Sequence, residues 1–198
     1  MLIAFCGIDG TGKSSHSKEI GNWLRNKGIK IKDSNLISDN HLFYDTFKQV
    51  TNMYEEKYEE DTDEGFSVLL AFEFFRRAKE VEKDISDGIG IIADRWTYCH
   101  YAYNYARNVN NKFANLLLDS CCKPDLVFLL DLPVNAALER IDRRGSRSYN
   151  ETTEVLEKAR EKYLEIAKEE KAIILDSADS FEYNQKIIKN IIKDKFEI

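Results

Sequence analysis

A glycine-rich segment near the start of the chain carries residues suited to phosphate chemistry. The stretch 7–14 reads GIDGTGKS and matches the pattern G-x-x-x-x-G-K-[ST] at every required position. Glycines let successive backbone N–H groups turn towards one anion, and a following helix adds the positive end of its dipole. We expect Lys13 to reach the β- and γ-phosphates of a nucleoside triphosphate and Ser14 to ligate Mg²⁺. The predicted phosphate-binding residues are Gly7, Asp9, Gly10, Thr11, Gly12, Lys13, Ser14 and Ser15.

A second pair of charged residues, Asp94 and Arg95, ends an apolar stretch that reads IIADRW. If this stretch is a strand of a parallel sheet, its carboxyl end lies beside the phosphate-binding loop. Asp94 can then hold Mg²⁺ or its water ligands, and Arg95 can hold a phosphate. A strand-end ion pair that caps a loop is the alternative interpretation of these two residues.

Two classes of nucleotide-binding protein lack their signatures in this sequence. A GTPase needs an N-K-x-D sequence for guanine, and the candidates that begin at Asn26 and Asn111 both lack the aspartate. A motor ATPase usually has an apolar strand that ends in Asp-Glu, whereas Arg95 follows Asp94 here. The pattern favours ATP over GTP, though only weakly.

An alternation of strands and helices must position these residues. Short apolar runs predict strands at 2–6, 29–34, 89–94, 124–132 and 171–177. Other patterns predict helices at 14–28, 40–60, 61–88, 97–107, 111–122, 134–143, 150–170 and 180–195. Strands separated by helices imply a parallel sheet covered on both faces. Since no linker or repeat is visible, we expect one α/β domain over 1–198.

The composition argues against several other kinds of protein. The 198 residues carry a net charge of −6, which suggests no general affinity for nucleic acids or anionic membranes. No apolar run approaches the roughly 18 residues of a membrane span, and the first residues read as a strand rather than as a signal peptide. The four cysteines lack the spacing of zinc ligands, so we expect free thiols and a cytoplasmic location.

Several stretches together resemble the thymidylate kinases, which belong to the P-loop nucleoside monophosphate kinases. GIDGTGKSS resembles the acidic P-loop of that family, and DRWTYCHYAYN is similar to its pattern D-R-Y-x-x-S-x-x-A-Y-Q. The family's third helix and third strand resemble LLAFEFFRRAKEVEKDISDGIGIIADRW. The stretch that leads into its lid resembles KPDLVFLLDLPVNAALERIDRRGSR, and the helix after the lid resembles EKAREKYLEIA. The resemblance implies a five-stranded parallel sheet in the order 2-3-1-4-5, flanked by helices, and a short mobile lid near 141–150.

The resemblance also implies which residues bind the nucleotide that accepts the phosphoryl group. Asp9 matches a carboxylate that contacts the 3′-hydroxyl of deoxyribose. Phe72 and Arg76 match an aromatic platform for thymine and an arginine that reads the base. Arg77 is a competing match, and simple core packing is the alternative for Phe72. The implied acceptor-binding residues are Asp9, Phe72, Arg76, Arg95, Cys99, Tyr103 and Asn104.

Four arginines cluster in the sequence ERIDRRGSR, which leads into the implied lid. An arginine at the migrating phosphoryl group typically raises the rate by about 10³–10⁵, and some relatives supply it from the lid. We expect Arg143, Arg144 and Arg147 to reach inward and Arg140 to stay on its helix and face solvent, although a solvated basic turn is the alternative. The implied catalytic residues are Lys13, Asp94, Arg95, Arg143, Arg144 and Arg147, with Ser14 and Asp94 as metal ligands.

The chain departs from the family pattern where the acceptor is bound. The family has T-R-E-P after its second strand, but no arginine lies here between Lys32 and Arg76. Cys99 and Asn104 replace a serine and a glutamine, and the lid motif D-R-x-E is not clear.

The expected function is the ATP- and Mg²⁺-dependent phosphorylation of a pyrimidine deoxynucleotide, with dTMP converted to dTDP. Relatives form homodimers, and the apolar face of 66–81 is the candidate interface. Another monophosphate or a deoxynucleoside is the alternative acceptor, and a nucleoside would need a base such as Asp9 or Asp39. A nucleotide-binding protein without turnover is the third possibility.

Overall fold

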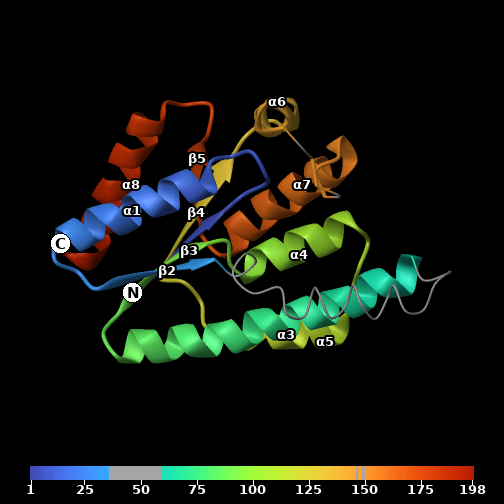
Figure 1. Ribbon diagram of the computed structural model, residues 1–198, viewed down its shortest axis with the longest axis horizontal. Coiled ribbons are helices and arrows are strands. Elements are labelled where there is room, and N and C mark those ends of the chain that lie inside the picture. Colours follow the sequence, from blue (N-terminus) through green and yellow to red (C-terminus); the bar gives the residue numbers. More distant parts are fainter. Residues whose placement is uncertain (36–58, 146, 149) are drawn as a thin grey trace.

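A sheet of five parallel strands forms the centre of the molecule (Figure 1). The computed structural model describes residues 1–35, 59–145, 147–148 and 150–198. The strand order is β2-β3-β1-β4-β5, which confirms the predicted fold class and strand order. The strands are β1 (Leu2–Cys6), β2 (Ile31–Asn35), β3 (Gly90–Asp94), β4 (Leu126–Asp131) and β5 (Ile173–Asp176).

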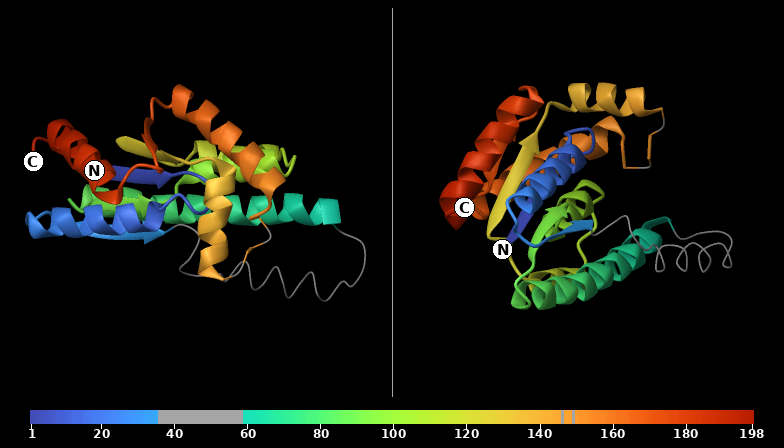
Figure 2. Two further views of the ribbon diagram at one scale, coloured as in Figure 1. Left: turned by 90° about the horizontal axis from the view of Figure 1, so that it is seen from above. Right: turned by 60° about the vertical axis from the view of Figure 1, so that its left-hand side comes forward.

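Helices cover both faces of the sheet, as the alternating pattern predicts (Figures 1 and 2). One face carries α1 (Lys13–Asn26) and α8 (Phe181–Phe196). The other face carries α3 (Glu59–Ser86), α4 (Thr97–Ala106) and α7 (Thr153–Glu169), with α5 (Lys112–Asp119) packed against α3 and α6 (Val134–Arg144) next to α7. Among the described residues, no helix is both long and apolar enough to cross a membrane.

Side chains of the central strands alternate between two apolar cores. Ile3 and Phe5 of β1 belong to the core under α1 and α8, which Ile20 and Ile188 complete. The intervening residues of the same strand belong to the core under α3, α4 and α7. Both faces of β1 and β3 are buried, which explains why these strands are continuous apolar runs in the sequence.

The strand order places the loop after β1 at a switch point of the topology. β3 and β2 lie on one side of β1, and β4 and β5 lie on the other. The ends of three strands are level, because Phe5 is in register with Asp94 and Asp94 is in register with Asn35. Open α/β sheets bind ligands at the carboxyl ends of their strands, at such a switch point. The carboxyl ends of β1, β2 and β3 therefore meet where a ligand is expected.

The element boundaries differ from the prediction mainly at the ends of helices. α7 begins after Thr152, whose side chain caps it by accepting a backbone hydrogen bond. The predicted lid near 141–150 contains the last turn of α6 and then Gly145, whose φ of +107° ends that helix. Most of the predicted helix at 40–60 lies outside the described residues.

Candidate active site

The loop that follows β1 needs its glycines because main-chain atoms approach it closely. Gly7 has a φ of +137° and Gly10 a φ of +85°, in the region that favours glycine. A Cβ atom at Gly7 would lie 2.4 Å from the carbonyl oxygen of Leu130, and one at Gly10 would lie 2.6 Å from that of Ala137. The loop therefore packs directly against the end of β4 and against α6.

The N-terminus of α1 opens onto this loop. Gly12, the residue before the helix, has a φ of +88° and provides no side-chain cap. The first backbone N–H groups of a helix have no partner within it, so an uncapped N-terminus suits an anion. Ser14 and Ser15 are exposed in this first turn, and the Thr11 hydroxyl donates to the carbonyl oxygen of Ile8 at 2.9 Å. The predicted phosphate-binding residues thus lie together.

The Lys13 side chain is buried within the loop rather than exposed on its surface. Its Nζ donates to the carbonyl oxygen of Ile8 at 2.7 Å and lies 3.9 Å from Oδ1 of Asp9. Burial, together with the charge of Arg95, lowers the pKa of Lys13 to about 8, against the opposing effects of Asp9 and Asp94. A phosphate beside Nζ would supply the negative charge that favours the protonated form.

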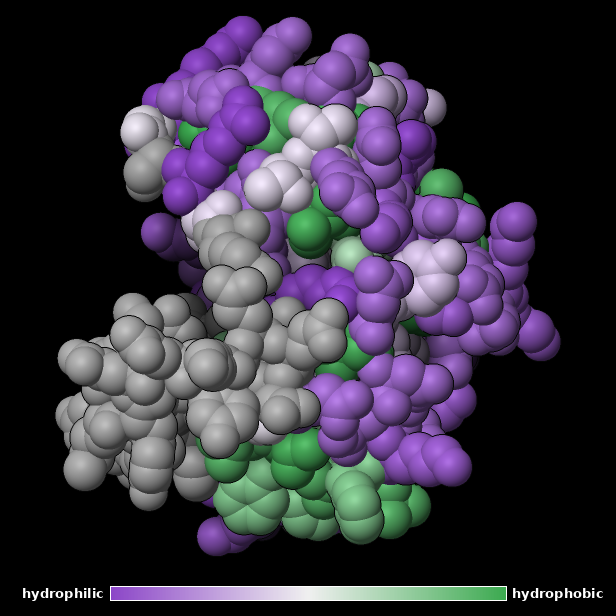
Figure 3. All heavy atoms as spheres, turned by 90° about the vertical axis from the view of Figure 1, so that its right-hand side faces the viewer, coloured by the Kyte–Doolittle hydropathy of each residue, from purple (hydrophilic) through white to green (hydrophobic). Residues whose placement is uncertain are grey.

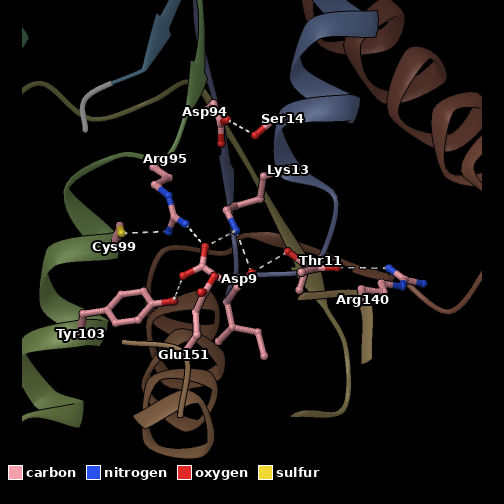
Figure 4. A network of polar contacts seen from close by, with 12 residues as sticks. Asp9, Thr11, Lys13, Ser14, Asp94, Arg95, Cys99, Tyr103, Arg140 and Glu151 are labelled. Carbon is pink, nitrogen blue, oxygen red and sulfur yellow. Dashed lines mark hydrogen bonds and ion pairs between the residues drawn. The ribbon is translucent and has the colours of Figure 1, made fainter. Parts of the chain in front are cut away.

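Asp94, the last residue of β3, pairs with Ser14 in the first turn of α1 (Figure 4). The Ser14 hydroxyl donates to Oδ2 of Asp94. The other carboxylate oxygen, Oδ1, is buried and has no hydrogen-bond partner among the described residues. Mg²⁺ prefers oxygen ligands, so a hydroxyl next to a carboxylate with an unused buried oxygen fits this ion. The pair is thus consistent with the predicted metal site.

Asp9 connects the loop to the far side of the site (Figure 4). Its Oδ1 accepts a hydrogen bond from Arg95, and its Oδ2 accepts one from the Tyr103 hydroxyl at 2.8 Å. Burial raises the pKa of Asp9, but the charges of Arg95 and Lys13 and the hydrogen bonds from Tyr103 and Arg95 outweigh burial and bring the pKa below its ordinary value. The carboxylate is therefore ionised at neutral pH.

Arg95 is held through both its backbone and its side chain. Its φ of +75° is uncommon for a residue with a side chain, and its backbone N–H donates to the carbonyl oxygen of Phe5 at 2.9 Å. Its Nη1 donates to Sγ of Cys99 at 3.3 Å, while Nη2 contacts Asp9. Five predicted site residues therefore form one connected cluster: Asp9, Lys13, Arg95, Cys99 and Tyr103.

Asn104 belongs to a separate buried network between α4 and α3. Its Nδ2 donates to Oγ of Ser67 at 2.7 Å, and its Oδ1 accepts from Arg107 at 3.3 Å. The Ser67 hydroxyl also lies 3.1 Å from Nε2 of His100, which is 3% exposed. The amide predicted to bind the acceptor thus joins two helices. The sequence gives no sign of Ser67 or His100 as its neighbours.

The structure does not bring Phe72 and Arg76 into the cluster. Each is 42% exposed on the outer face of α3, and Arg76 forms ion pairs with glutamates of its own helix. Arg77, the competing match, is 14% exposed and donates from Nη1 to the carbonyl oxygen of Asn35 at 3.3 Å. Of the two neighbouring arginines, Arg77 is therefore the one that reaches the carboxyl edge of the sheet.

The three arginines expected to reach inward from the lid are exposed instead. Arg144 pairs with the buried Glu151, and Arg147 pairs with Asp142. Arg143 is also exposed. In the described part of the chain, the ion pairs of Arg144 and Arg147 thus lie within the lid segment or directly after it, rather than at the P-loop.

Arg140 is exposed on α6, as expected, but its guanidinium also contacts the backbone of the site. Its guanidinium donates to the carbonyl oxygen of Gly10 at 3.4 Å and to that of Ser177 at 2.8 Å (Figure 4). One side chain of α6 therefore spans the glycine loop and the segment after β5. Both of its partners are backbone carbonyls, which no side-chain pattern in the sequence reveals. Asp39, the other carboxylate considered as a base, lies outside the described residues.

The geometry defines a class of protein. A buried lysine and a guanidinium at the switch point of a parallel sheet provide positive charge for a ligand. The backbone N–H groups of the glycine-rich loop favour a phosphate as that ligand. The molecule is built as a phosphotransferase of the P-loop kinase type.

A narrower identity follows from comparison with known families. The family model of thymidylate kinase matches residues 5–188, so the chain belongs to the thymidylate kinase family. Enzymes of this family are nucleoside monophosphate kinases, which confirms the predicted enzyme class.

Curated relatives cover almost the whole chain. The "Probable thymidylate kinase 1" of Saccharolobus solfataricus is 31% identical over 98% of this chain and 98% of its own length. The "Thymidylate kinase" of Plasmodium falciparum is 28% identical over 99% of this chain and 91% of its own length. The "Probable thymidylate kinase" of Archaeoglobus fulgidus is 28% identical over 98% and 95%, respectively.

Proposed function

We propose that the protein transfers the γ-phosphoryl group of ATP to dTMP and so forms dTDP. The observation that carries this proposal is the cluster around Asp9, in a chain of the thymidylate kinase family. Its carboxylate lies between Lys13, which opens the helix after the P-loop, and Tyr103 and Arg95 on the other side. This places a hydrogen-bond acceptor for a sugar hydroxyl beside two cations for phosphates.

The reaction needs positioning and positive charge more than it needs a base. The second pKa of a phosphate monoester is about 6, so dTMP is largely dianionic at neutral pH and can attack the γ-phosphorus in line. Lys13 and Arg95 are placed to stabilise the charge on the transferring group. Ser14 and Asp94 would hold the Mg²⁺ that neutralises charge on the β- and γ-phosphates.

Steady-state kinetics with a panel of acceptors tests the proposal. ADP formation should be stimulated most by dTMP, less by dUMP and little by thymidine. We expect a high KM for dTMP if no other cation replaces the arginine that is missing after the second strand. If thymidine is the better substrate, the acceptor is a nucleoside; if no acceptor stimulates ADP formation, the protein binds nucleotide without turnover.

Among single substitutions at the acceptor side, Arg95→Ala should cause the largest loss of kcat/KM for dTMP. One charge-assisted contact is worth about 1.5–3 kcal/mol, or roughly one to two orders of magnitude in affinity. Arg25→Ala is the control, because Arg25 is likewise paired with an aspartate but lies near the end of α1, away from the site. An equal loss in both variants would contradict the role of Arg95.

We also propose that two copies associate through the outer faces of α3 and α5. Phe72 is 42% exposed, and Phe113 and Leu116 of α5 are 73% and 65% exposed. Figure 3 shows hydrophobic residues gathered along the lower edge of the molecule, where these helices lie in Figure 1. Exposed apolar surface of this kind commonly marks an interface between proteins.

Analytical ultracentrifugation at micromolar concentration should give a mass of about 46 kDa, twice the 23.0 kDa of one chain. Phe113→Glu should shift the protein to the monomer. Tyr183→Glu, a change of an aromatic residue 55% exposed on α8, should leave the dimer intact. A wild-type monomer would contradict the proposal.

A cytoplasmic location is proposed as well, supported by four cysteines that are all free thiols.

A further inference from the structure

Arg77 presents a cation at the carboxyl edge of the sheet, beside the strand that carries the catalytic aspartate. Its Nη1 donates to the carbonyl oxygen of Asn35, the last residue of β2. Asn35 is the register partner of Asp94 in β3, and Arg95 follows Asp94 directly. Neighbouring strands lie about 4.8 Å apart. The guanidinium-bearing residues Arg77 of α3 and Arg95 after β3 are therefore attached at adjacent strand ends.

The level of Arg77 along α3 agrees with this placement. α3 ends at Ser86, and β3 begins at Gly90 after a short turn. From Ser86 back to Arg77 the helix rises about 13 Å, and from Gly90 to Asp94 the strand rises about 13 Å. Arg77 therefore stands level with Asp94, at the strand ends beside the P-loop. Residues earlier in α3, such as Glu73, stand farther beyond the edge of the sheet.

The Arg77 guanidinium is fixed before any ligand arrives. Its Nε donates to Oε1 of Glu73 at 2.7 Å, and its Nη1 is bound to Asn35. Burial raises the pKa of Glu73, but hydrogen bonds and charges from Arg76 and Arg77 outweigh burial and lower it, so the carboxylate stays ionised. Within the described part of the chain, Nη2 donates no hydrogen bond. A guanidinium held on two sides keeps its third nitrogen for a phosphate oxygen.

We propose that Arg77 binds the 5′-phosphate of the acceptor nucleotide. The inference rests on the proposed function. It also accounts for a feature of the sequence, because no arginine lies between Lys32 and Arg76 to provide this charge from the segment after β2. The positive charge that this segment lacks comes instead from a helix that reaches the same strand end.

The test separates binding of the phosphate from binding of the base. Thymidine shares the base and sugar of dTMP but lacks the phosphate, so its Ki as a competitor of dTMP reports the rest of the site. Arg77→Ala should raise the KM for dTMP about 10- to 100-fold. The Ki of thymidine and the KM for ATP should change less than about twofold. Arg77→Lys, which retains the charge, should recover part of the lost affinity.

Lys79→Ala is the matched control, because Lys79 is an exposed cation of the same helix whose ion pair is with Glu82. It should leave the KM for dTMP unchanged. An equal loss of dTMP and thymidine affinity in Arg77→Ala would show that Arg77 reads the base and would overturn the inference. So would an unchanged KM, or a larger effect of Arg76→Ala on dTMP alone.

The melting temperature of each variant shows whether the fold is intact. If Arg77→Ala fails to fold, the same comparison of dTMP with thymidine is made on Arg77→Lys, in which a selective loss for dTMP supports the inference and a parallel loss contradicts it. A wild-type protein that neither binds nor phosphorylates dTMP would overturn the proposed function first. Failure of the inference alone would leave wild-type turnover of dTMP intact.

Discussion

The Tyr103 hydroxyl donates a 2.8 Å hydrogen bond to Oδ2 of Asp9, so α4 holds the carboxylate of the P-loop from the opposite side of the site. The other oxygen of the carboxylate is bound to Arg95. Both oxygens are thus oriented by protein groups. The group proposed to meet the sugar hydroxyl is therefore preorganised, which lowers the ordering cost of binding.

Tyr103→Phe should weaken acceptor binding while leaving ATP binding unchanged. The change removes one hydrogen bond to a partly buried carboxylate, worth about 1.5–3 kcal/mol. We expect kcat/KM for dTMP to fall at least about tenfold, measured by initial rates at saturating ATP. Tyr101→Phe is the control, because that hydroxyl lies on the same helix but bonds Asp119. Equal losses in both variants would assign the effect to α4 packing.

Lys13→Met should abolish turnover and stabilise the fold. Burial lowers the pKa of Lys13 from an ordinary 10.5 to about 8. At neutral pH the folded protein therefore holds a protonated lysine that reduces its free energy of unfolding. Removing an unfavourably buried charge should raise the free energy of unfolding by about 1–3 kcal/mol. Chemical denaturation at pH 7 measures this change.

Lys18→Met provides the comparison, since Lys18 is exposed on the same helix and should change neither activity nor stability greatly. A Lys13→Met variant that turns over ATP normally would mean that the nucleotide site lies elsewhere. A variant that is inactive but markedly less stable would contradict the argument from burial.

Asp94→Asn should raise the Mg²⁺ concentration that the reaction requires. The amide can still accept the hydrogen bond from Ser14, but it lacks the negative charge that favours a divalent cation. We expect the half-maximal Mg²⁺ concentration to rise about tenfold or more, with a smaller effect on the KM for dTMP. Asp125→Asn removes a carboxylate at the opposite edge of the sheet, next to the N-terminus, and should leave the Mg²⁺ profile unchanged.

His100 should make the protein less stable as the pH falls below neutrality. Burial, with the charge of Arg107, lowers the pKa of His100 from 6.5 to about 3. Between these values the unfolded chain binds a proton that the folded chain does not, so stability decreases as pH falls through the window. A full proton corresponds to about 1.4 kcal/mol per pH unit.

His100→Asn should therefore flatten the dependence of unfolding free energy on pH between 6.5 and 3. His16, whose pKa burial lowers to about 4, offers a second comparison. His16→Asn should flatten the dependence over a narrower window that ends near pH 4. An unchanged slope in His100→Asn would show that this histidine is charged or solvated in the folded protein.

The fold and the phosphate loop could be predicted because their signals are local. Continuous apolar runs such as 2–6 and 89–94 are long enough for strands and too short for ordinary helices. Arg95, Cys99 and Tyr103 are spaced by four residues, which places them on one face of a helix and its N-terminal approach. The structure indeed joins Arg95 to Cys99, and both Arg95 and Tyr103 to Asp9.

The remaining site contacts depend on how the elements are rotated against one another, which spacing does not define. The spacing from Phe72 favours Arg76, yet Arg77 is the arginine that turns towards Asn35. Arg140 reaches the backbone of Gly10, 130 residues away, through an interaction that needs no particular side chain there. Tertiary packing determines which of these arginine side chains reach the site.

The close approach of Gly10 to Ala137 also has a mechanical consequence. Main-chain atoms of the P-loop and α6 already touch there, so the start of α6 cannot slide across the loop without opening that contact. Gly145, by contrast, has a φ of +107°, and no described residue would contact a Cβ atom added there. The P-loop and the first turns of α6 are therefore expected to move together, whereas a glycine at 145 leaves the chain at the end of α6 more conformational freedom.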